Sequence, residues 1–206
     1  MHDCGLTVAG FAPISLLPAI HAAGMKAIVS DLRSTNYSWN SVDPATAKKN
    51  IQSLTAEVKD NPTVVGYYLR DEPDASAFPG LGTVAALIHE NDPDAWPYIN
   101  LFPNYATPGQ LGTKDYNEYL EKFIATCHPP IISYDNYSLL DNGGLRDEYF
   151  SNLQAVHDAS VKHHIPFWNI VLSNCHFNYA EPSPATFRFQ AYTTLADGAH
   201  GIAYFT

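Results

Sequence analysis

The sequence is poor in charge, and especially in positive charge. Of its 206 residues, 11 are lysine or arginine and 21 are aspartate or glutamate, so the formal net charge is 11 − 21 = −10. An acidic chain without a basic cluster repels phosphate backbones and anionic lipid surfaces. We therefore expect neither nucleic acid nor a membrane among its partners.

Long apolar runs and a cysteine framework are missing as well. No stretch approaches the roughly 20 apolar residues that cross a bilayer. The first residues, Met1-His2-Asp3-Cys4, lack the basic and apolar regions of a signal peptide. The 3 cysteines, Cys4, Cys127 and Cys175, are an odd number without metal-ligand spacing. We expect no disulfide framework, no metal and no cofactor.

Aromatic residues, in contrast, are abundant: 13 Tyr, 10 Phe and 3 Trp make up 13 % of the chain. Aromatic rings pack on the apolar faces of sugars and other flat ligands, and they also fill protein cores. Rings in loops are therefore candidates for ligand contacts, whereas rings within strands are equally suited to the core.

Short apolar runs alternate with helical patterns along the whole chain. We expect strands over residues 5–11, 25–30, 63–69, 96–101, 130–134, 165–172 and 201–205. We expect helices over residues 14–23, 44–59, 79–90, 113–127, 146–163 and 184–196, the fourth capped by Thr113. From the second strand onward the strands begin near 26, 63, 96, 131, 165 and 201, which is a spacing of 33 to 37 residues.

A strand-then-helix unit of constant length is typical of a parallel sheet with right-handed crossovers. The sheet can be an open doubly wound sheet or a closed barrel. No Gly-x-Gly-x-x-Gly or phosphate loop follows any strand, which favours the barrel. We predict a single domain, residues 1–206, of the α/β class: a (β/α)8 TIM-barrel type truncated to seven strands.

In a parallel barrel the reacting groups follow the carboxyl ends of the strands. Carboxylates, amides and aromatic rings occur after most of the predicted strands, and such groups suit a polyhydroxylated ligand. The candidate ligand-binding residues are Asp31, Asp71, Asn100, Tyr105, Tyr134, Tyr137, Trp168 and His176.

The segment Tyr67-Tyr68-Leu69-Arg70-Asp71-Glu72-Pro73 carries two adjacent carboxyl groups at a strand end. Buried neighbouring carboxyl groups are unfavourable unless each has a partner or one keeps its proton, and a retained proton makes a general acid. Pro73 is expected to hold Glu72 in an extended conformation. Glu72 is the predicted proton donor, and a helix cap is the alternative role.

Two segments resemble the clan A type of glycoside hydrolases. Val65–Pro73 (VGYYLRDEP) is similar to the strand-four motif of the clan, in which a Glu after Asn is the general acid/base; here Asp71 precedes Glu72. Residues 196–206 (ADGAHGIAYFT) are similar to the strand-eight segment of beta-galactosidase-like members. The resemblance implies barrel strands two to eight, with the first strand and last helix absent, and an exported parent protein.

The second catalytic carboxylate has several candidates. The nucleophile of the clan is a Glu at the end of strand seven, but the strand over residues 165–173 ends without a carboxylate. The second carboxylate is then Asp135, from strand six, or Glu181, from the following loop. Loss of activity is the remaining alternative.

We predict a glycosidase that cleaves O-glycosidic bonds of an oligo- or polysaccharide with Glu72 and a second carboxylate. One alternative is a carbohydrate-binding or inactive barrel fragment. Another is a metal-dependent barrel hydrolase or isomerase that uses Asp31, Glu72, Asp135 and His176, although no His-x-His or Glu-x-x-His spacing supports it.

The incomplete barrel also leads to an expectation about assembly. The strands over residues 5–11 and 201–205 would be apolar sheet edges without the lysine or proline that protects a free edge. We expect a homodimer that closes the gap, because symmetric pairs are the commonest way to bury such a surface.

Overall fold

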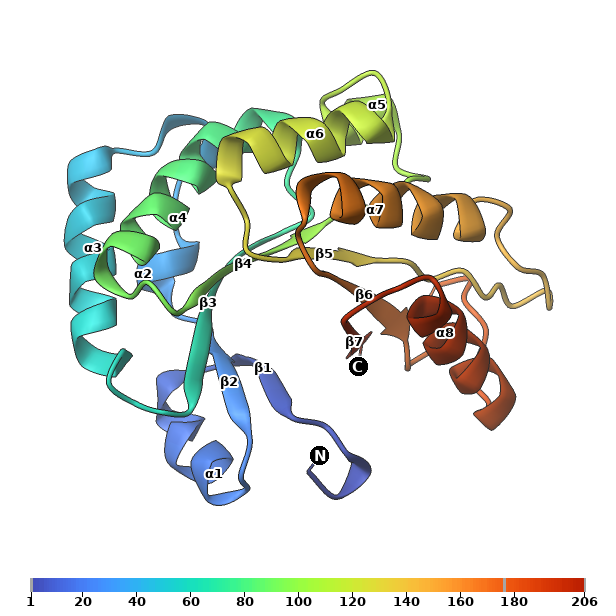
Figure 1. Ribbon diagram of the computed structural model, residues 1–206, viewed down its shortest axis with the longest axis horizontal. Helices are drawn as coiled ribbons and strands as arrows, with labels where there is room; N and C mark the ends of the chain where they lie inside the picture. Colours follow the sequence, from blue (N-terminus) through green and yellow to red (C-terminus); the bar gives the residue numbers. More distant parts are fainter. Residues whose placement is uncertain (1, 176, 206) are drawn as a thin grey trace. The chain divides into compact units, whose positions relative to one another are not determined.

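Strands and helices alternate along the chain (Figure 1). The computed structural model describes residues 2–175 and 177–205. Neighbouring strands pair in parallel wherever their register is described. The strands are β1 (Val8–Ala12), β2 (Lys26–Val29), β3 (Val64–Asp71), β4 (Trp96–Leu101), β5 (Ile132–Asp135), β6 (Phe167–Leu172) and β7 (Gly201–Phe205).

Helices occupy most of the connections between the strands. They are α1 (Leu17–Ala22), α2 (Leu32–Thr35), α3 (Pro44–Val58), α4 (Phe78–Asn91), α5 (Pro108–Leu111), α6 (Tyr116–Cys127), α7 (Tyr149–His163) and α8 (Pro184–Ala196). Short 3-10 segments are His2–Cys4, Ile14–Leu16, Trp39–Ser41 and Ala75–Ala77. Within the described ranges, no helix combines the length and the apolar character needed to cross a bilayer.

The order of the strands in the sheet identifies the fold class. Over residues 2–175 and 177–205 the sheet has seven strands in the order β1-β2-β3-β4-β5-β6-β7, which is also their order in the chain. A doubly wound sheet reverses its strand order at a switch point, whereas a barrel adds each strand beside the previous one. The prediction of a (β/α) barrel type truncated to seven strands is confirmed.

Two compact units share the chain. The first consists of Met1–Asp71, Ser76–Ile99 and Phe123–Pro129, and it holds β1, β2, β3 and most of β4. The second consists of Glu72–Ala75, Asn100–Lys122 and Pro130–Thr206, and it holds the end of β4 with β5, β6 and β7. The four residues Glu72–Ala75 therefore pack with the second unit although β3 belongs to the first.

The core follows the apolar pattern of the sequence. In α3 the predicted inner positions Ile51, Leu54 and Val58 are all buried. The predicted start of α6 is wrong: the helix begins at Tyr116 and not at Thr113. The carboxylate of Asp115 accepts the N–H of Glu118 at 2.9 Å, as an N-cap does, so Asp115 ends the preceding loop.

Candidate active site

Glu72 leaves β3 in an unusual backbone conformation. Its φ is +40°, in the left-handed region that non-glycine residues rarely adopt. Its N–H donates to the carbonyl of Asn100 at 2.9 Å, so the chain turns while it is still bonded to β4. The expectation that Pro73 keeps Glu72 extended is therefore wrong. Residues with such φ values persist only where the surroundings hold them, and they are concentrated at functional sites.

The surroundings hold Glu72–Ala75 from two further directions. The hydroxyl of Tyr119, on α6, donates to the carbonyl of Pro73 at 2.6 Å, and the Tyr119 side chain is fully buried. Gly112 has a φ of +68°, and a Cβ built on it would lie 3.1 Å from the backbone nitrogen of Ala75. Glu72 is thus carried by a short segment that α6 and the loop after α5 both restrain.

A buried polar triad joins the ends of β4 and β5. Asn100 Nδ2 donates to Asp135 Oδ1 at 2.7 Å, and Ser133 Oγ donates to Asn100 Oδ1 at 3.1 Å. All three residues are buried, with Asp135 only 3 % exposed. The register pairs Asn100 with Ser133, and Asp135 lies two residues further along the same strand face. The amide therefore uses its donor and its acceptor to orient a buried carboxyl group.

Tyr134 lies on the other face of β5. Its side chain is fully buried, and burial, together with the nearby phenols of Tyr116 and Tyr149 on α6 and α7, raises its pKa well above the ordinary value. Its register partner Asn169 donates to Thr194 Oγ1 on α8 at 2.9 Å, so this face of the sheet is covered by helices. Tyr134 therefore faces the helices, on the opposite side of β5 from Asp135.

Four aromatic rings and one arginine come together from the connections after β4, β5 and β6 and from the end of β7. We call Tyr105, Tyr137, Arg146, Tyr179 and Phe205 the aromatic cluster. Tyr137 packs edge-on against Tyr179, with ring centroids 5.6 Å apart, and lies 5.2 Å from the ring of Phe205. The hydroxyl of Tyr105 accepts the N–H of Tyr137 at 3.4 Å. The guanidinium carbon of Arg146 lies 4.0 Å from the ring centroid of Tyr105.

The electrostatics of Tyr105 connect this cluster to the triad. Burial raises the pKa of its phenol strongly, and the neighbouring groups Tyr179 and Asp135 raise it further. The hydrogen bond from the N–H of Tyr137 places the Tyr105 hydroxyl at the segment that directly follows Asp135. The predicted ligand-binding residues Asn100, Tyr105 and Tyr137 are thus brought together around Asp135.

Asn152 of α7 fixes the two loops that carry these rings. Its Oδ1 accepts the N–H of Asn104 at 3.0 Å and the side-chain N–H of Asn136 at 2.8 Å. Asn104 follows β4 and Asn136 follows β5, and Asn152 is fully buried. A single helical side chain thus holds both loops in position.

Other predicted site residues lie elsewhere. Asp71 and Glu181 are exposed, Glu181 in the loop before α8. Trp168 is the second residue of β6, four residues before the end of that strand, and it packs on Gly201 of β7. His176 lies outside the described residues.

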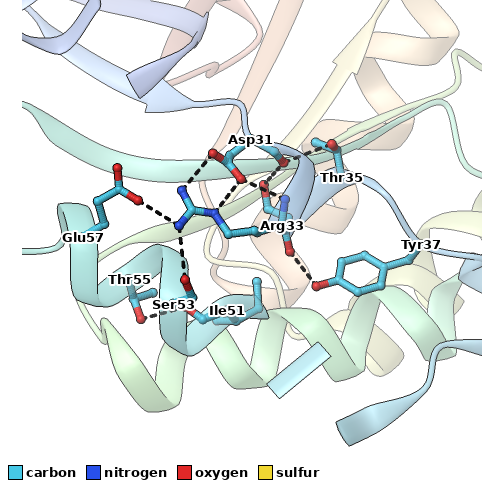
Figure 2. A network of polar contacts seen from close by, with 9 residues as sticks. Asp31, Arg33, Thr35, Tyr37, Ile51, Ser53, Thr55 and Glu57 are labelled. Atoms are coloured by element: carbon cyan, nitrogen blue, oxygen red, sulfur yellow. Dashed lines mark hydrogen bonds and ion pairs between the residues drawn. The ribbon is translucent and has the colours of Figure 1, made fainter. Parts of the chain in front are cut away.

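Asp31 takes part in a polar network in the first unit (Figure 2). Its carboxylate accepts the N–H and Nε–H of Arg33, both at 2.8 Å, and a third hydrogen bond from the same guanidinium at 2.9 Å. Arg33 also pairs with Glu57 at 2.8 Å. These hydrogen bonds lower the pKa of Asp31 below its usual 3.8. The described contacts give this carboxyl the role of a helix cap and ion-pair partner.

Several site residues were not expected from the sequence. Ser133 could have been found from its position two residues before Asp135 on the same strand face. Tyr119 appears in the pattern only as an apolar position of a helix, and nothing local indicates that Arg146 or Tyr179 meets Tyr105. Among residues 2–175 and 177–205, no three His, Cys, Asp or Glu side chains are placed to hold a metal ion.

Comparison with known proteins finds its matches among solved structures. No family model and no curated protein matches the sequence. A protein assigned as an alpha-L-fucosidase from Bacteroides thetaiotaomicron matches with a TM-score of 0.67 and 12 % identity, over 99 % of this chain and 69 % of that one. An endo-1,4-beta-D-mannanase from Thermotoga petrophila matches with a TM-score of 0.60 and 13 % identity, over 91 % of this chain and 66 % of that one.

A beta-galactosidase from the psychrophilic Marinomonas ef1 also matches, with a TM-score of 0.61 and 10 % identity, over 93 % of this chain and 45 % of that one. At such identities the likeness establishes the fold. The chain has the barrel-type fold found in these glycoside hydrolases, and the resemblance to clan A is confirmed at the level of fold. This chain spans between 45 % and 69 % of the length of these three proteins.

Proposed function

We propose that the protein is a glycoside hydrolase in which Glu72 is the general acid/base and Asp135 is the second catalytic carboxylate. The proposal rests on one observation. Asn100 binds the backbone of Glu72 through its carbonyl and the carboxyl group of Asp135 through its side-chain amide. Two carboxyl-bearing strand ends are therefore tied to the same residue, at the edge where barrel enzymes carry their reacting groups.

The chemistry follows from the two carboxyl groups. Glu72 donates its proton to the glycosidic oxygen as the bond from that oxygen to the anomeric carbon breaks. Asp135 then either attacks the anomeric carbon or removes a proton from the attacking water. A separation of about 5–5.5 Å between the carboxyl groups corresponds to the first course and about 6.5–9.5 Å to the second.

The aromatic cluster supports a carbohydrate ligand. Tyr137 and Phe205 offer half-buried and partly exposed ring surface beside the loop that begins at Asp135. Such rings stack on the C–H faces of sugars, while amide and carboxylate groups bind the hydroxyls. Substitution of Tyr137 by Ala should weaken sugar binding, and substitution by Phe should retain most of it.

The test is hydrolysis by Glu72→Gln and Asp135→Asn variants. The rates of each variant on aryl glycosides and on neutral and acidic oligosaccharides are compared with the rates of wild type. Glu118→Gln, which makes the same substitution at an exposed position of α6, is the control. Glu72→Gln should lower the rate on substrates with poor leaving groups by about 10²–10⁴-fold. NMR of the first product anomer assigns retention or inversion.

An unchanged rate in Glu72→Gln would refute the assignment of the proton donor. A wild-type protein that binds oligosaccharides without hydrolysing any of them would favour the alternative, a carbohydrate-binding barrel. That alternative has a specific basis in this chain, because β6 is followed by Ser173 and Asn174 rather than by a carboxylate.

A further inference from the structure

We propose that Arg146 makes this site selective for an acidic sugar, a glycan residue that carries a carboxylate. The inference deepens the proposed function and rests on it for the identity of the ligand as a carbohydrate. It names the substrate class, and it is carried by the position, the charge and the unused hydrogen-bonding capacity of one side chain.

The backbone of Arg146 is held at both of its polar groups. Its N–H donates to the carbonyl of Ser138 at 2.8 Å, and its carbonyl accepts the N–H of Tyr149 at the start of α7 at 3.1 Å. The side chain then lies on the ring of Tyr105 and 6.0 Å from the ring centroid of Tyr179. A cation over an aromatic face is attracted by the negative face of the ring, and this attraction holds the Arg146 side chain in its position.

The guanidinium of Arg146 has hydrogen-bonding capacity that its described contacts do not use. A guanidinium that lies on a ring uses its flat face, while its five N–H groups point outward in its plane. Within the described ranges Arg146 forms no ion pair, and its buried Nε has no hydrogen-bond partner. A buried donor without a partner is unfavourable by an amount comparable to a lost hydrogen bond, so it calls for a ligand or an ordered water.

The ion pairs of Arg33, an arginine with a structural role, differ from the contacts of Arg146. The guanidinium of Arg33 is neutralised by Asp31 and Glu57 together. Arg146 is different, although the protein has 21 acidic residues and only 11 lysines and arginines. In so acidic a chain, an arginine without a carboxylate partner is a local attraction for an external anion.

Arg146 lies on the same loops as the proposed catalytic group. Tyr105, on which it packs, accepts the N–H of Tyr137, two residues beyond Asp135. A sugar whose ring contacts the aromatic cluster would then present its substituents to the guanidinium. The planar fork of arginine matches a carboxylate with two parallel hydrogen bonds, which a neutral hydroxymethyl group cannot accept in the same way.

The test compares binding of matched acidic and neutral probes. The probes are oligogalacturonides, glucuronic-acid-substituted xylooligosaccharides and oligomannuronates, each with its carboxyl-reduced counterpart, and binding is measured by calorimetry. Wild type should prefer one acidic probe over its reduced form. Arg146→Gln should weaken binding of that acidic probe by about 10- to 100-fold and leave the reduced form unaffected.

Two further variants make the result decisive. Arg146→Lys keeps the charge but lacks the fork, so it should recover only part of the preference. Arg188→Gln, an exposed arginine on α8, should behave as wild type. Thermal unfolding of each variant identifies a loss of fold. If Arg146→Gln does not fold, the test relies on Arg146→Lys, for which the ratio of the affinities for the acidic probe and its reduced form is compared with that of wild type.

Equal affinity for acidic and reduced probes in wild type, or an unchanged preference in Arg146→Gln, would overturn the proposal. A preference for sulfated oligosaccharides over carboxylated ones would overturn the assignment of the anion. These outcomes are independent of hydrolysis. If Glu72→Gln leaves the rate unchanged while Arg146→Gln abolishes acid selectivity, the proposed function fails and the binding inference stands.

Discussion

Asn100 Nδ2 donates a hydrogen bond to Asp135 Oδ1 at 2.7 Å, and both side chains are buried. The same amide accepts from Ser133, and the Asn100 carbonyl accepts from the N–H of Glu72. Asn100 thus forms hydrogen bonds both to the strand end that carries the proposed acid, Glu72, and to the strand end that carries the proposed second carboxylate, Asp135. Buried polar groups that are satisfied in this way specify a single arrangement.

Removal of this amide should affect both stability and activity. Asn100→Ala removes one hydrogen bond from a buried carboxyl group and one from a buried hydroxyl, which should destabilise the fold by about 1–3 kcal/mol. Asn117→Ala, at an exposed position of α6, is the matched control. Urea unfolding measures the difference. A variant as stable as wild type would mean that water or another group replaces the amide.

The hydroxyl of Tyr119 should matter for Glu72 through the loop that it holds. Tyr119→Phe removes the donor to the carbonyl of Pro73 and should destabilise the protein by about 1 kcal/mol. Because Tyr119 acts by positioning, kcat should fall with little change in KM. Tyr192→Phe, on a side chain that is 65 % exposed, should change neither quantity. An unaltered kcat would show that the loop needs no such restraint.

Gly201 should resist replacement because of the indole beside it. Trp168 and Gly201 are register partners on β6 and β7, and a Cβ on Gly201 would lie 2.4 Å from Trp168 Nε1. Gly201→Ala should lower stability by about 1–3 kcal/mol, measured by thermal unfolding. Gly109→Ala, where the nearest atom would be 3.9 Å away, should be neutral. The double variant Gly201→Ala with Trp168→Ala should lose less stability than the sum of the losses of the two single variants, because without the indole the new Cβ meets no clash.

The Asp31–Arg33 pair should make part of the stability depend on pH. Arg33 lowers the pKa of Asp31 below 3.8, so its stabilising effect is full at neutral pH and is lost as the pH falls through the lowered value. Asp31→Asn keeps a capping oxygen and removes the charge. We expect a loss of about 1 kcal/mol at neutral pH that becomes smaller at acidic pH, where Asp31 is protonated in both the folded and the unfolded chain; the loss is modest because both side chains are partly exposed. Asp60→Asn, at an exposed position, is the control. An equal loss at both pH values would assign the effect to shape rather than charge.

The expected homodimer stays a prediction, and light scattering over a dilution series tests it. Its basis is the apolar character of β1 and β7, the first and last strands of the described sheet. Association that weakens on dilution is the expected result, and a mass that stays monomeric at every concentration would contradict it.

The sequence by itself determined the class of fold and the residues that follow each strand. The apolar runs at a constant spacing predict the seven strands, and the predicted ranges for α8 and β7 agree with the structure. These features depend on local periodicity and on caps such as Ser183, whose side chain accepts the N–H of Thr186. Local signals of this kind act within a few residues and can be recognised without knowing the neighbours.

Only the tertiary structure decided how the site is assembled. Alternation along β5 predicts that Tyr134 and Asp135 point to opposite faces, but the packing of α6 and α7 selects which face is covered. The positive φ of Glu72 depends on a hydrogen bond to Asn100, 28 residues further along the chain. Arg146 meets Tyr105 because Asn152 positions two separate loops. Each of these contacts joins segments that are distant in sequence. The residues next to each partner therefore give no local pattern from which the contact could be predicted.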